Sequence, residues 1–404
     1  MNPDAPPEQC DVAVVGAGIL GLAAAREIAL RHPRKRIAVI EREPEVGQHQ
    51  TGHNSGVIHA GIYYPPGSLK ARLCTAGARE MYDYCERKGI AHERCGKLIV
   101  ALDESQLPGL DELERRGREN GVPGLKRLDT RGIGQLEPHA AGVAALHSPH
   151  TGIADFPGVA KALADDLREA GGSVTTSCAV HKVTDSGTIT HARGETHAAT
   201  VLVCAGAWSD RLATAAGAPA DPRIVPFRGA YLRLKPERRA LVNGLIYPVP
   251  NPELPFLGVH LTKHVDGDVL IGPTALLSPA RDAYSLRTIR RRDVGSTLRW
   301  PGTYRMARRF WRTGLSEMRY AASRRAFVRE AARYVPDLRV ADVTSGPAGV
   351  RAQALSRDGK LVDDFVFSRT GRALHVRNAP SPAATSALAI ARMIADEAES
   401  SVGP

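Results

Sequence analysis

The first forty residues combine two short apolar runs with a segment of helical character. Residues 11–15 (DVAVV) form the first run, LAAAREIAL favours a helix, and a second run covers residues 37–40. Short apolar runs bounded by turn residues are typical of buried strands. Parallel strands need a long connection, which is usually a helix. The pattern therefore predicts a strand–helix–strand unit at the beginning of the chain.

The turn of this unit has the spacing of a dinucleotide-binding motif, GAGILG. Gly16 permits the tight turn, Gly18 lets the backbone approach a pyrophosphate, and Gly21 lets helix and strand pack closely. The N–H groups at the start of the helix then face the phosphates. Glu41 closes the second strand, where its carboxylate can accept the ribose hydroxyls. We predict a bound dinucleotide, although this unit alone does not separate FAD from NAD.

Three later features favour FAD. A loop rich in Gly, His and Ser (residues 47–61) follows the second strand directly. The segment VLVCAGAWS (201–209) reads as a buried strand that enters a turn of small residues and can pass beneath a dinucleotide. The chain also lacks a second complete nicotinamide-type motif.

The remaining pattern predicts an α/β fold with two domains. We expect strands near residues 226–234, 245–249, 256–262 and 268–272, because these runs are bounded by turn residues. They would form a mainly antiparallel β-sheet in a substrate domain, above a discontinuous Rossmann-type FAD-binding domain. The expected ranges are 1–90, 150–215 and 340–404 for the FAD-binding domain, and 91–149 and 216–339 for the substrate-binding domain. The active site would lie between the two.

Composition narrows the class of protein without changing this architecture. The chain has 404 residues, of which 43% are hydrophobic and 24% charged, as in ordinary globular proteins. No apolar stretch approaches the roughly 18 residues of a membrane-spanning helix. The N-terminal residues lack the pattern of a secretory signal. The six cysteines form no CxxC pair, so we expect reduced thiols, no metal site and a cytoplasmic location.

The positive charge is concentrated in one segment. Residues 281–333 hold 15 arginines, no lysine and four acidic residues, an excess equal to the net charge of +11 of the whole chain. The simplest interpretation is a solvated helical face whose aromatic residues belong to the core. The alternative is peripheral contact with an anionic membrane, at the inner face of the bilayer. We expect no nucleic acid partner, because no nucleic-acid motif accompanies the charge.

The motifs also carry a family resemblance. GAGILGL with Glu41, QTGHNSGVIHAGIYY (50–64) and VLVCAGAWS resemble the D-amino-acid-oxidase-like superfamily of FAD oxidoreductases. Within it, four longer segments resemble the L-2-hydroxyglutarate dehydrogenase/oxidase family: PFRGAYLRL (226–234), LIYPVPNPELPFLGVHLTKHVDGDVLIGP (245–273), SGPAGVRAQALSRDGKLVDDFVF (345–367) and LHVRNAPSPAATSALAI (374–390). Residues 275–300 depart from it, since they are richer in arginine than this family leads us to expect.

The resemblance covers about residues 10–395 and implies oxidation of L-2-hydroxyglutarate to 2-oxoglutarate, with hydride transfer to the flavin N5. The alternatives are another 2-hydroxy acid, glycerol 3-phosphate or an amino acid as substrate, or a binding protein in which FAD is structural. We expect non-covalent FAD, because no cysteine lies in a flavin-linking context. Oxygen or a quinone would be the electron acceptor.

Oxidation of an alcohol needs a base, and histidine has a pKa near the working pH. His59 is the first candidate, because small residues flank it in SGVIHAG and let the backbone pass close to a flavin. The same pattern is similar to that of flavin-dependent oxidases in which this histidine lies beside the flavin. His53 and His260 are the reserve candidates. We expect His53 to line the cofactor, while His260 could equally be a structural histidine of a strand.

Arg351 is the candidate for binding the substrate carboxylate, since an arginine can bind a carboxylate with two hydrogen bonds. It follows the loop GPAGV, and the place resembles the Gly-x-Arg position that holds a substrate carboxylate in this superfamily. The alternative is an ion pair of Arg351 with Asp363 or Asp364.

Four further residues are candidates for binding the substrate beside His59 and Arg351. Arg228 and Lys263 would bind the second carboxylate or the flavin edge. Tyr231 and Tyr247 would donate a hydroxyl to the substrate, or would only be aromatic residues of the sheet. Surface cations are common, so these assignments depend on which side chains the fold brings together.

The segment NAPSPAAT (378–385) precedes a helix near the C-terminus. Ser381 can act as its N-cap, so that free N–H groups would face the flavin N1/C2=O. The alternative is a capped helix without a ligand. The complete set of predicted cofactor contacts is Gly16, Gly18, Ile19, Gly21, Glu41, Arg42, Thr51, His53, Asn54, Ser55, Val180, Ala205, Gly206, Trp208, Pro380, Ser381, Ala383, Ala384 and Thr385.

Overall fold

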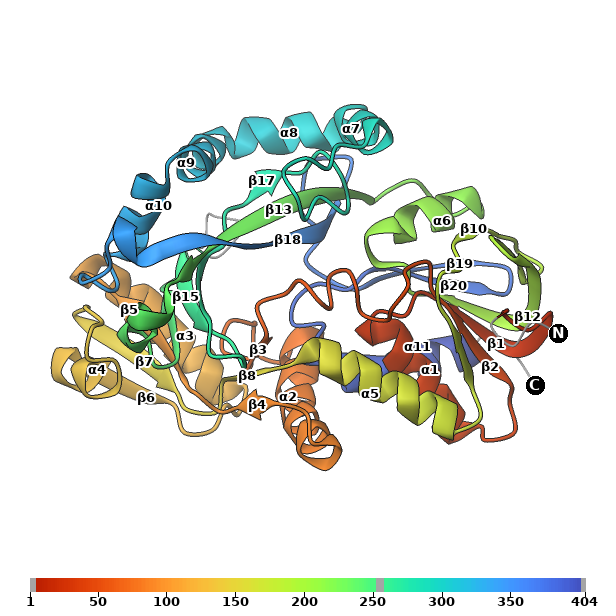
Figure 1. Ribbon diagram of the computed structural model, residues 1–404, viewed down its shortest axis with the longest axis horizontal. Helices are drawn as coiled ribbons and strands as arrows, with labels where there is room; N and C mark the ends of the chain where they lie inside the picture. Colours follow the sequence, from red (N-terminus) through yellow and green to blue (C-terminus); the bar gives the residue numbers. More distant parts are fainter. Residues whose placement is uncertain (1–4, 252–257, 401–404) are drawn as a thin grey trace.

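The computed structural model describes residues 5–251 and 258–400, and it confirms the expected α/β class. Two large sheets lie beside each other, and helices cover them on several sides (Figure 1). Part of the expected strand 256–262, namely residues 256 and 257, lies outside the described residues. No helix in the described ranges has both the length and the apolar character needed to cross a membrane.

The first sheet is built on the predicted strand–helix–strand unit. Its order is β10-β11-β12-β1-β2-β9, with β20 beside β12 and β19 beside β20. β1 pairs in parallel with β2 and with β12, and β12 pairs in parallel with β20. The strands are β1 Gln9–Val15, β2 Ile37–Ile40, β9 Ser173–Thr175, β10 Val180–Val183, β11 Thr188–His191, β12 Gly194–Val203, β19 Val366–Thr370 and β20 Ala373–Asn378.

Helices from distant parts of the chain cover this sheet. Buried residues of α1, α2, α5 and α11 join with those of the central strands in one hydrophobic cluster, so the N-terminal and C-terminal helices share a core. The helices around the sheet are α1 Ile19–Arg31, α2 Leu69–Lys88, α5 Phe156–Glu169, α6 Ser209–Ala215 and α11 Ala387–Glu399.

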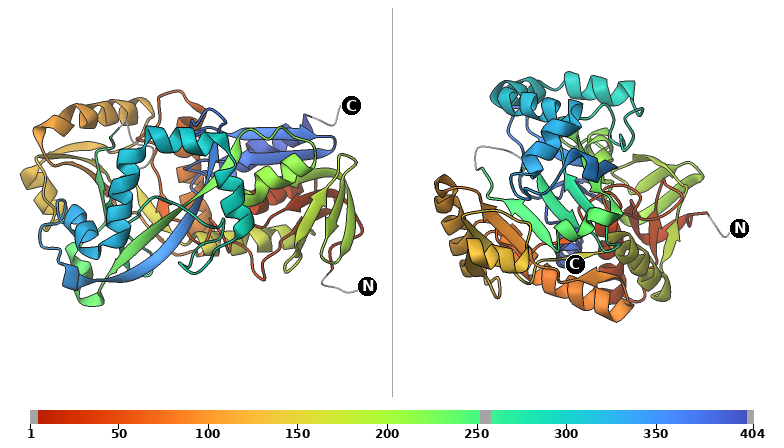
Figure 2. Two further views of the ribbon diagram at one scale, coloured as in Figure 1. Left: turned by 90° about the horizontal axis from the view of Figure 1, so that it is seen from above. Right: turned by 60° about the vertical axis from the view of Figure 1, so that its left-hand side comes forward.

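The second sheet has the order β17-β13-β16-β15-β14-β5-β7-β6, with β18 beside β13. Its neighbours are antiparallel except for β14 and β5. The long strands β13 and β18 extend between the two halves of the molecule (Figure 2). The strands are β5 Lys97–Ala101, β6 Lys126–Asp129, β7 Ala144–Ser148, β13 Arg223–Leu234, β14 Leu245–Pro248, β15 His260–Lys263, β16 Val269–Gly272, β17 Leu276–Leu277 and β18 Val343–Leu355.

The strand pairing does not support the expected boundary of the FAD-binding domain at residue 340. The expected FAD-binding domain includes residues 340–404, but β18 pairs with β13 from Arg223 to Leu234 and belongs to the second sheet. Only β19, β20 and α11 of that range return to the first sheet. The reason is the long antiparallel register of β13 and β18, which local sequence does not reveal.

Smaller elements connect the sheets. A short third sheet has the order β3-β8-β4, with strands β3 Val57–Ile58, β4 His92–Glu93 and β8 Gly152–Ala154. Helices α3 Leu107–Glu119 and α4 Thr130–Leu136 flank the second sheet. Short 3₁₀ helices cover Glu104–Gln106, Gly206–Trp208, Pro236–Leu241 and Val340–Asp342.

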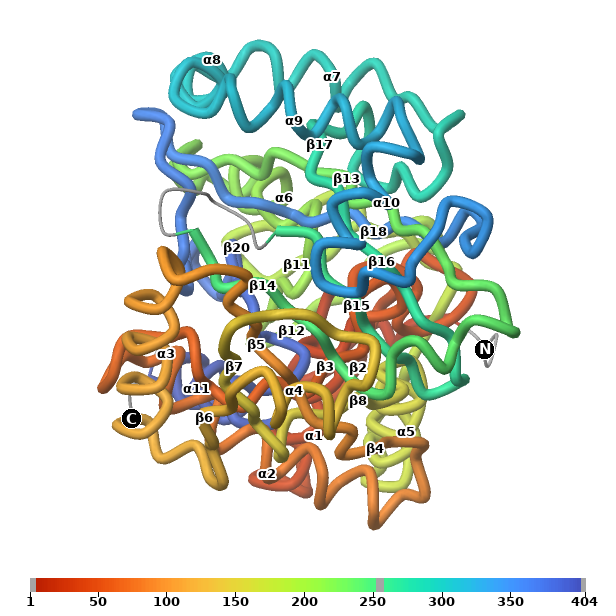
Figure 3. Tube along the Cα trace, turned by 90° about the vertical axis from the view of Figure 1, so that its left-hand side faces the viewer, coloured from red at the N-terminus to blue at the C-terminus, as the bar shows by residue number. Residues whose placement is uncertain are grey.

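The arginine-rich segment forms four consecutive helices, of which α7, α8 and α9 lie above the second sheet and α10 descends beside β18 (Figure 3). They are α7 Arg291–Leu298, α8 Pro301–Arg309, α9 Trp311–Ala322 and α10 Arg324–Ala331. A buried ion pair between Arg281 and Asp210 fastens the beginning of this segment to α6. Arg281 also donates to the carbonyl of Ile224 (3.1 Å) at the start of β13. The segment is therefore anchored where the two halves of the molecule meet.

Candidate active site

The turn before α1 has the shape that a pyrophosphate needs. A Cβ atom at Gly21 would lie 2.0 Å from the carbonyl oxygen of Gly16, and one at Gly16 would lie 2.5 Å from that of Cys204. At Gly18, by contrast, a Cβ would contact only Thr51 Oγ1, at 3.6 Å. Gly18, the N-cap residue of α1, has no side chain that could cover the first N–H groups of the helix, of which that of Ile19 is bonded to Thr51. The backbone is thus packed behind the turn and open in front of it, which fits the phosphates of a dinucleotide.

Glu41 is buried at the end of β2, as the motif requires. Its carboxylate accepts hydrogen bonds from the backbone N–H of Ala17 (2.7 Å) and of Glu43 (2.9 Å). A carboxylate offers about four acceptor positions. The two bonds therefore fix its orientation and leave capacity for ribose hydroxyls.

Thr51 joins the loop after β2 to this turn. Its hydroxyl accepts the N–H of Ile19 at 3.1 Å, in the first turn of α1. Asn54 holds the next part of the loop, since its amide donates to Thr51 O (2.8 Å) and accepts from Gly56 N (2.7 Å). Both predicted cofactor residues thus order the segment that leads to His59.

Several other predicted cofactor residues form a cluster of rings. The Arg42 guanidinium lies 3.5 Å from the ring centre of Trp208, and His49 lies 4.8 Å from the same ring. His53 stacks on Tyr284 at 3.7 Å, so a residue of the arginine-rich segment takes part. Cofactor contact remains a prediction for these residues and for Ser55, Val180, Ala205, Gly206, Pro380, Ala383 and Ala384.

The expected cap of the C-terminal helix is wrong. α11 begins at Ala387 and its N-cap residue is Ser386, not Ser381. Turns occupy the residues between them, with the N–H of Ser386 bonded to the carbonyl of Pro382 at 3.0 Å. Pro382 disfavours a helical conformation in the residue before it. Ser381 therefore lies outside the helix, where its side chain is exposed.

Thr385 positions the loop that carries His59. Its hydroxyl donates to the carbonyl of Val57 (3.2 Å) and accepts the backbone N–H of His59 (3.1 Å). The Cys74 thiol bonds to the carbonyl of His59 on the other side. A residue predicted to touch the cofactor thus connects the C-terminal segment to the candidate base.

One face of the second sheet points toward this loop. Side chains alternate between the two faces of a strand. On β15, His260 and Thr262 therefore share a face, where Tyr247 stacks on His260 (ring centres 4.1 Å apart) and its hydroxyl reaches Thr262 Oγ1 at 3.4 Å. Lys97 lies on the same face, 4.1 Å from the centre of the Tyr247 ring. These side chains are buried.

Burial makes the candidate base neutral. Desolvation, followed by the positive charge of Lys97, holds the pKa of His59 well below its ordinary value. The Nδ1 atom of His59 is buried and has no hydrogen-bond partner among the described residues. A neutral imidazole with an unbonded ring nitrogen is suited to accept a proton or a hydrogen bond from a ligand.

His260 fits a structural role better. Its Nδ1 lies 2.8 Å from the carbonyl of Gly258, which fixes the ring. Burial lowers its pKa to about 3, and the charges of Arg351 and Lys97 add to this effect. His260 therefore presents a fixed neutral ring to the site.

Arg351 belongs to the same cluster. Burial raises the pKa of Tyr231 and of Tyr247, and the nearby Arg351 charge opposes the rise in both. The predicted group of Arg351, Tyr231, Tyr247 and His260 is thus brought together from β13, β14, β15 and β18. The partner of Asp363 is Lys70, with its ammonium 2.5 Å away.

Two predicted cations do not join this group. Arg228 lies opposite Val350 in the register and Phe227 lies opposite Arg351, so Arg228 and Arg351 occupy opposite faces of the sheet. Arg228 Nε donates to the carbonyl of Ala283 at 2.9 Å. Lys263 points away from His260 and forms an ion pair with Glu93 at 2.7 Å. Arg228 and Lys263 are both absent from the group because their side chains lie on the other face of the sheet.

Lys97 belongs to the site although the sequence motifs did not point to it. It begins the strand KLIVA, in which every residue is buried. Burial lowers its pKa to about 7. The sequence did contain a signal, namely a lysine directly before the apolar run LIVA. A lysine is almost never fully buried unless it is paired. Tyr63 was missed too, and its buried hydroxyl has no hydrogen-bond partner in the described ranges.

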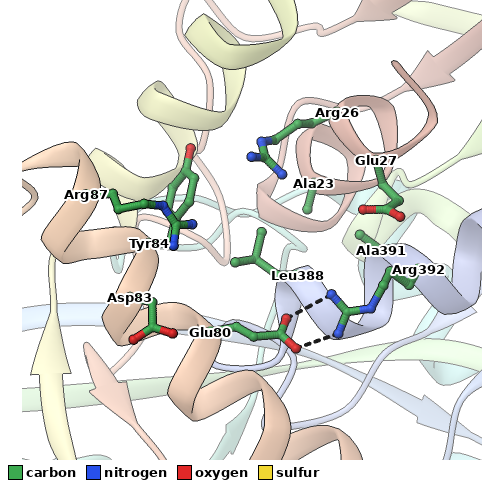
Figure 4. A pocket seen from close by; sticks show the side chains of 10 residues that line it. All are labelled: Ala23, Arg26, Glu27, Glu80, Asp83, Tyr84, Arg87, Leu388, Ala391 and Arg392. Carbon is green, nitrogen blue, oxygen red and sulfur yellow. Dashed lines mark hydrogen bonds and ion pairs between the residues drawn. The ribbon is translucent and has the colours of Figure 1, made fainter. Parts of the chain in front are cut away.

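A charged pocket lies elsewhere, between α1, α2 and α11 (Figure 4). Two of its arginines are paired with carboxylates, and Arg392 binds Glu80 through two hydrogen bonds of 2.6 and 3.0 Å. Arg26 pairs with Asp166 at 2.5 Å. These internal pairs make it a poor site for an anionic ligand.

Comparisons with known proteins agree with the geometry. Residues 11–397 match the family described as FAD dependent oxidoreductase. The chain is 49% identical to the mitochondrial L-2-hydroxyglutarate dehydrogenase of Nematostella vectensis, over 97% of this chain and 91% of that protein. It is 46% identical to the human mitochondrial enzyme of the same name, with coverages of 96% and 88%.

A bacterial relative and a solved structure extend the comparison. The L-2-hydroxyglutarate dehydrogenase of Indibacter alkaliphilus is 43% identical, over 94% of this chain and 96% of that protein. The fold is similar to L-alpha-glycerophosphate oxidase of Mycoplasma pneumoniae with FAD bound, with a TM-score of 0.79 and 22% identity. That alignment covers 97% of this chain and 95% of the other.

The role of Thr385 can be tested by replacing its hydroxyl. Thr385→Val leaves the carbonyl of Val57 and the N–H of His59 without this partner, and we expect a loss of about 1–3 kcal/mol in the free energy of unfolding. Thr385→Ser keeps the hydroxyl and serves as the matched control. Urea unfolding of the two variants measures the difference. A valine variant as stable as the serine variant would contradict the role.

Proposed function

The chain belongs to the family of FAD-dependent oxidoreductases, and on that premise we propose that it oxidises L-2-hydroxyglutarate to 2-oxoglutarate. The observation that carries the proposal is a neutral imidazole, His59, whose Nδ1 atom is buried and unbonded, near the buried Lys97 and the half-buried Arg351. Such a group suits an anionic hydroxy acid. The names of relatives that match nearly the whole chain support the same substrate.

The two hydrogens of the alcohol leave in different forms. When bound, FAD accepts a hydride from the carbinol carbon. His59 Nδ1 takes the proton of the hydroxyl, so that the product carbonyl can form. His59 must be neutral to do this, and its lowered pKa keeps it neutral at pH 7. The negative charge of the substrate then stabilises the imidazolium.

Arg351 binds the carboxylate next to the reacting carbon in this proposal. Its guanidinium can form two parallel hydrogen bonds to a carboxylate, which fixes the direction of the carbinol C–H bond. The hydroxyl of Tyr231 lies near this charge and stays protonated, since desolvation raises its pKa. It can therefore donate a hydrogen bond to the substrate.

We also propose that the segment α7–α10 docks on an anionic membrane and that a membrane quinone accepts the electrons. The expected burial of its aromatic residues holds for Trp300, but Tyr304 and Trp311 are 60% and 56% exposed. Trp311, Leu315 and Met318 form an exposed stripe at helical spacing on α9. Arginines surround the stripe, and each can contribute about 1 kcal/mol near an anionic bilayer.

The substrate is tested by anaerobic mixing of the purified flavoprotein with candidate acids. We expect L-2-hydroxyglutarate to bleach the flavin band near about 450 nm, because the cofactor is the electron sink. The D isomer, glycerol 3-phosphate and amino acids should leave the band unchanged. Bleaching by one of these compounds, with none by the L isomer, would overturn the proposed substrate.

The base is tested by His59→Asn. We expect kcat/KM to fall about 10²- to 10⁴-fold, the usual contribution of a positioned base. Because burial lowers the pKa of His59, activity of the wild-type protein should persist well below pH 6.5, the ordinary histidine pKa. His139→Asn, which changes an exposed histidine paired with Asp337, is the control. An unchanged rate in His59→Asn, with FAD retained, would rule out this base.

Membrane docking is tested by sedimentation with vesicles. We expect binding to phosphatidylserine vesicles but not to phosphatidylcholine vesicles, and release by added salt. The double change Trp311→Ser and Leu315→Ser should abolish binding, whereas Leu136→Ser, at another exposed leucine, should not. Equal binding of both variants would refute docking through α9.

A further inference from the structure

Lys97 is a buried cation that the proposed chemistry has not used. Only 2% of its surface is exposed, although lysine is among the residues least often buried. Its ammonium lies over the ring of Tyr247 at 4.1 Å and near that of Tyr63 at 5.3 Å. These aromatic faces attract a cation weakly but do not neutralise it.

No carboxylate of the described ranges forms an ion pair with Lys97. The nearby thiols do not supply a negative charge either, because burial raises the pKa of Cys74 to about 12 and that of Cys95 to about 11. Burying a charge without a partner is costly. A site with this property is completed when an anion enters.

The strand register places Lys97 on the sheet face of Leu245 and Thr262, and the pairing continues across β16 and β13 to Arg351 on the same face. The Tyr63 ring that Lys97 approaches lies four residues after His59, and the Lys97 charge also lowers the pKa of His59. A bound hydroxy acid would therefore meet Arg351, the base and Lys97 on one side of the second sheet. Lys263 and Arg228, the cations expected from sequence, are held elsewhere.

We propose that Lys97 binds the second carboxylate of the substrate and thereby makes the site select dicarboxylates over monocarboxylates. This inference rests on the proposed function, because it names the group that would recognise the far end of L-2-hydroxyglutarate. It assigns that role to one side chain of β5, on the same face of the sheet as Arg351.

Binding and protonation are linked at this site. Because burial lowers the pKa of Lys97 to about 7, the side chain is mostly neutral at about pH 8 in the absence of a ligand. A bound carboxylate favours the charged form and raises this pKa. A dicarboxylate should therefore bind with uptake of a proton above pH 7. Below pH 7 the lysine is already charged, and binding should take up no proton there.

The test compares glutarate with pentanoate, in which a methyl group replaces one carboxylate. Neither has a hydroxyl group, so both report binding to the oxidised holoenzyme without turnover. Titration calorimetry in two buffers of different ionisation enthalpy gives the affinity and the number of protons taken up. In the wild-type protein we expect glutarate to bind about 10- to 100-fold more tightly than pentanoate, the range of a charge-assisted hydrogen bond.

Lys97→Met should remove this preference by weakening glutarate alone. Proton uptake of about one per glutarate at about pH 8 should vanish in the variant and be absent with pentanoate in both proteins. Lys126→Met, at an exposed lysine of β6, is the matched control. Thermal unfolding and the flavin spectrum report whether the variant is intact. Removing an unpaired buried charge should leave it at least as stable as the wild type.

Three outcomes would overturn the role of Lys97. One is a Lys97→Met protein that still prefers glutarate. Another is loss of turnover with unchanged glutarate affinity, which would make Lys97 a proton-transfer group. The third needs no variant: glutarate binding to the wild type without proton uptake. If L-2-hydroxyglutarate reduces the wild-type flavoprotein and one of these outcomes is found, only the role of Lys97 is refuted. A wild type that neither binds glutarate nor is reduced refutes the proposed function.

Discussion

Completion of the first sheet is the constraint on which the other parts of the structure depend. β1 carries the dinucleotide turn, and it is a central strand only because β2 lies on one side and β12 on the other. β20 then extends the sheet from the far end of the chain. The chain must therefore leave the sheet twice and return, and the excursions form the second sheet. The candidate site lies where these excursions turn back.

The return of the chain also positions the chemistry. Thr385 precedes α11, which packs on α1, and its hydroxyl bonds to the two residues that flank Ile58 in the loop of His59. The second sheet contributes its face with Arg351, and the loop after β2 contributes the base. Neither half contains both groups. A misplaced C-terminal segment would therefore disturb the base, although more than 300 residues separate the two in sequence.

Short sequence patterns predicted those features of the fold and the site that depend only on neighbouring residues in the chain. The glycine motif, the strands of the second sheet and the histidine flanked by small residues all follow from short patterns. The face on which a side chain lies depends on register, and β13 and β18 shift register between Ala230 and Leu232. Arg228 and Arg351 could not be separated without that register. Ser381 does not cap α11, because Pro382 follows it and the helix begins only at Ala387. The domain ranges and the cofactor contacts stay predictions.

The electrostatics of the site favour the substrate over the empty protein. Lys97 and Arg351 contribute positive charge in a region where burial, as the dominant cause, keeps His59 and His260 neutral. Without a ligand, desolvation opposes this charge and Lys97 releases its proton near neutral pH. With a dianion present, the same low dielectric strengthens each attraction. The desolvation that destabilises the charged lysine in the free protein therefore favours binding of an anionic ligand. If a carboxylate of the protein neutralised Lys97, the protein would fold more easily and would bind an anionic acid less well.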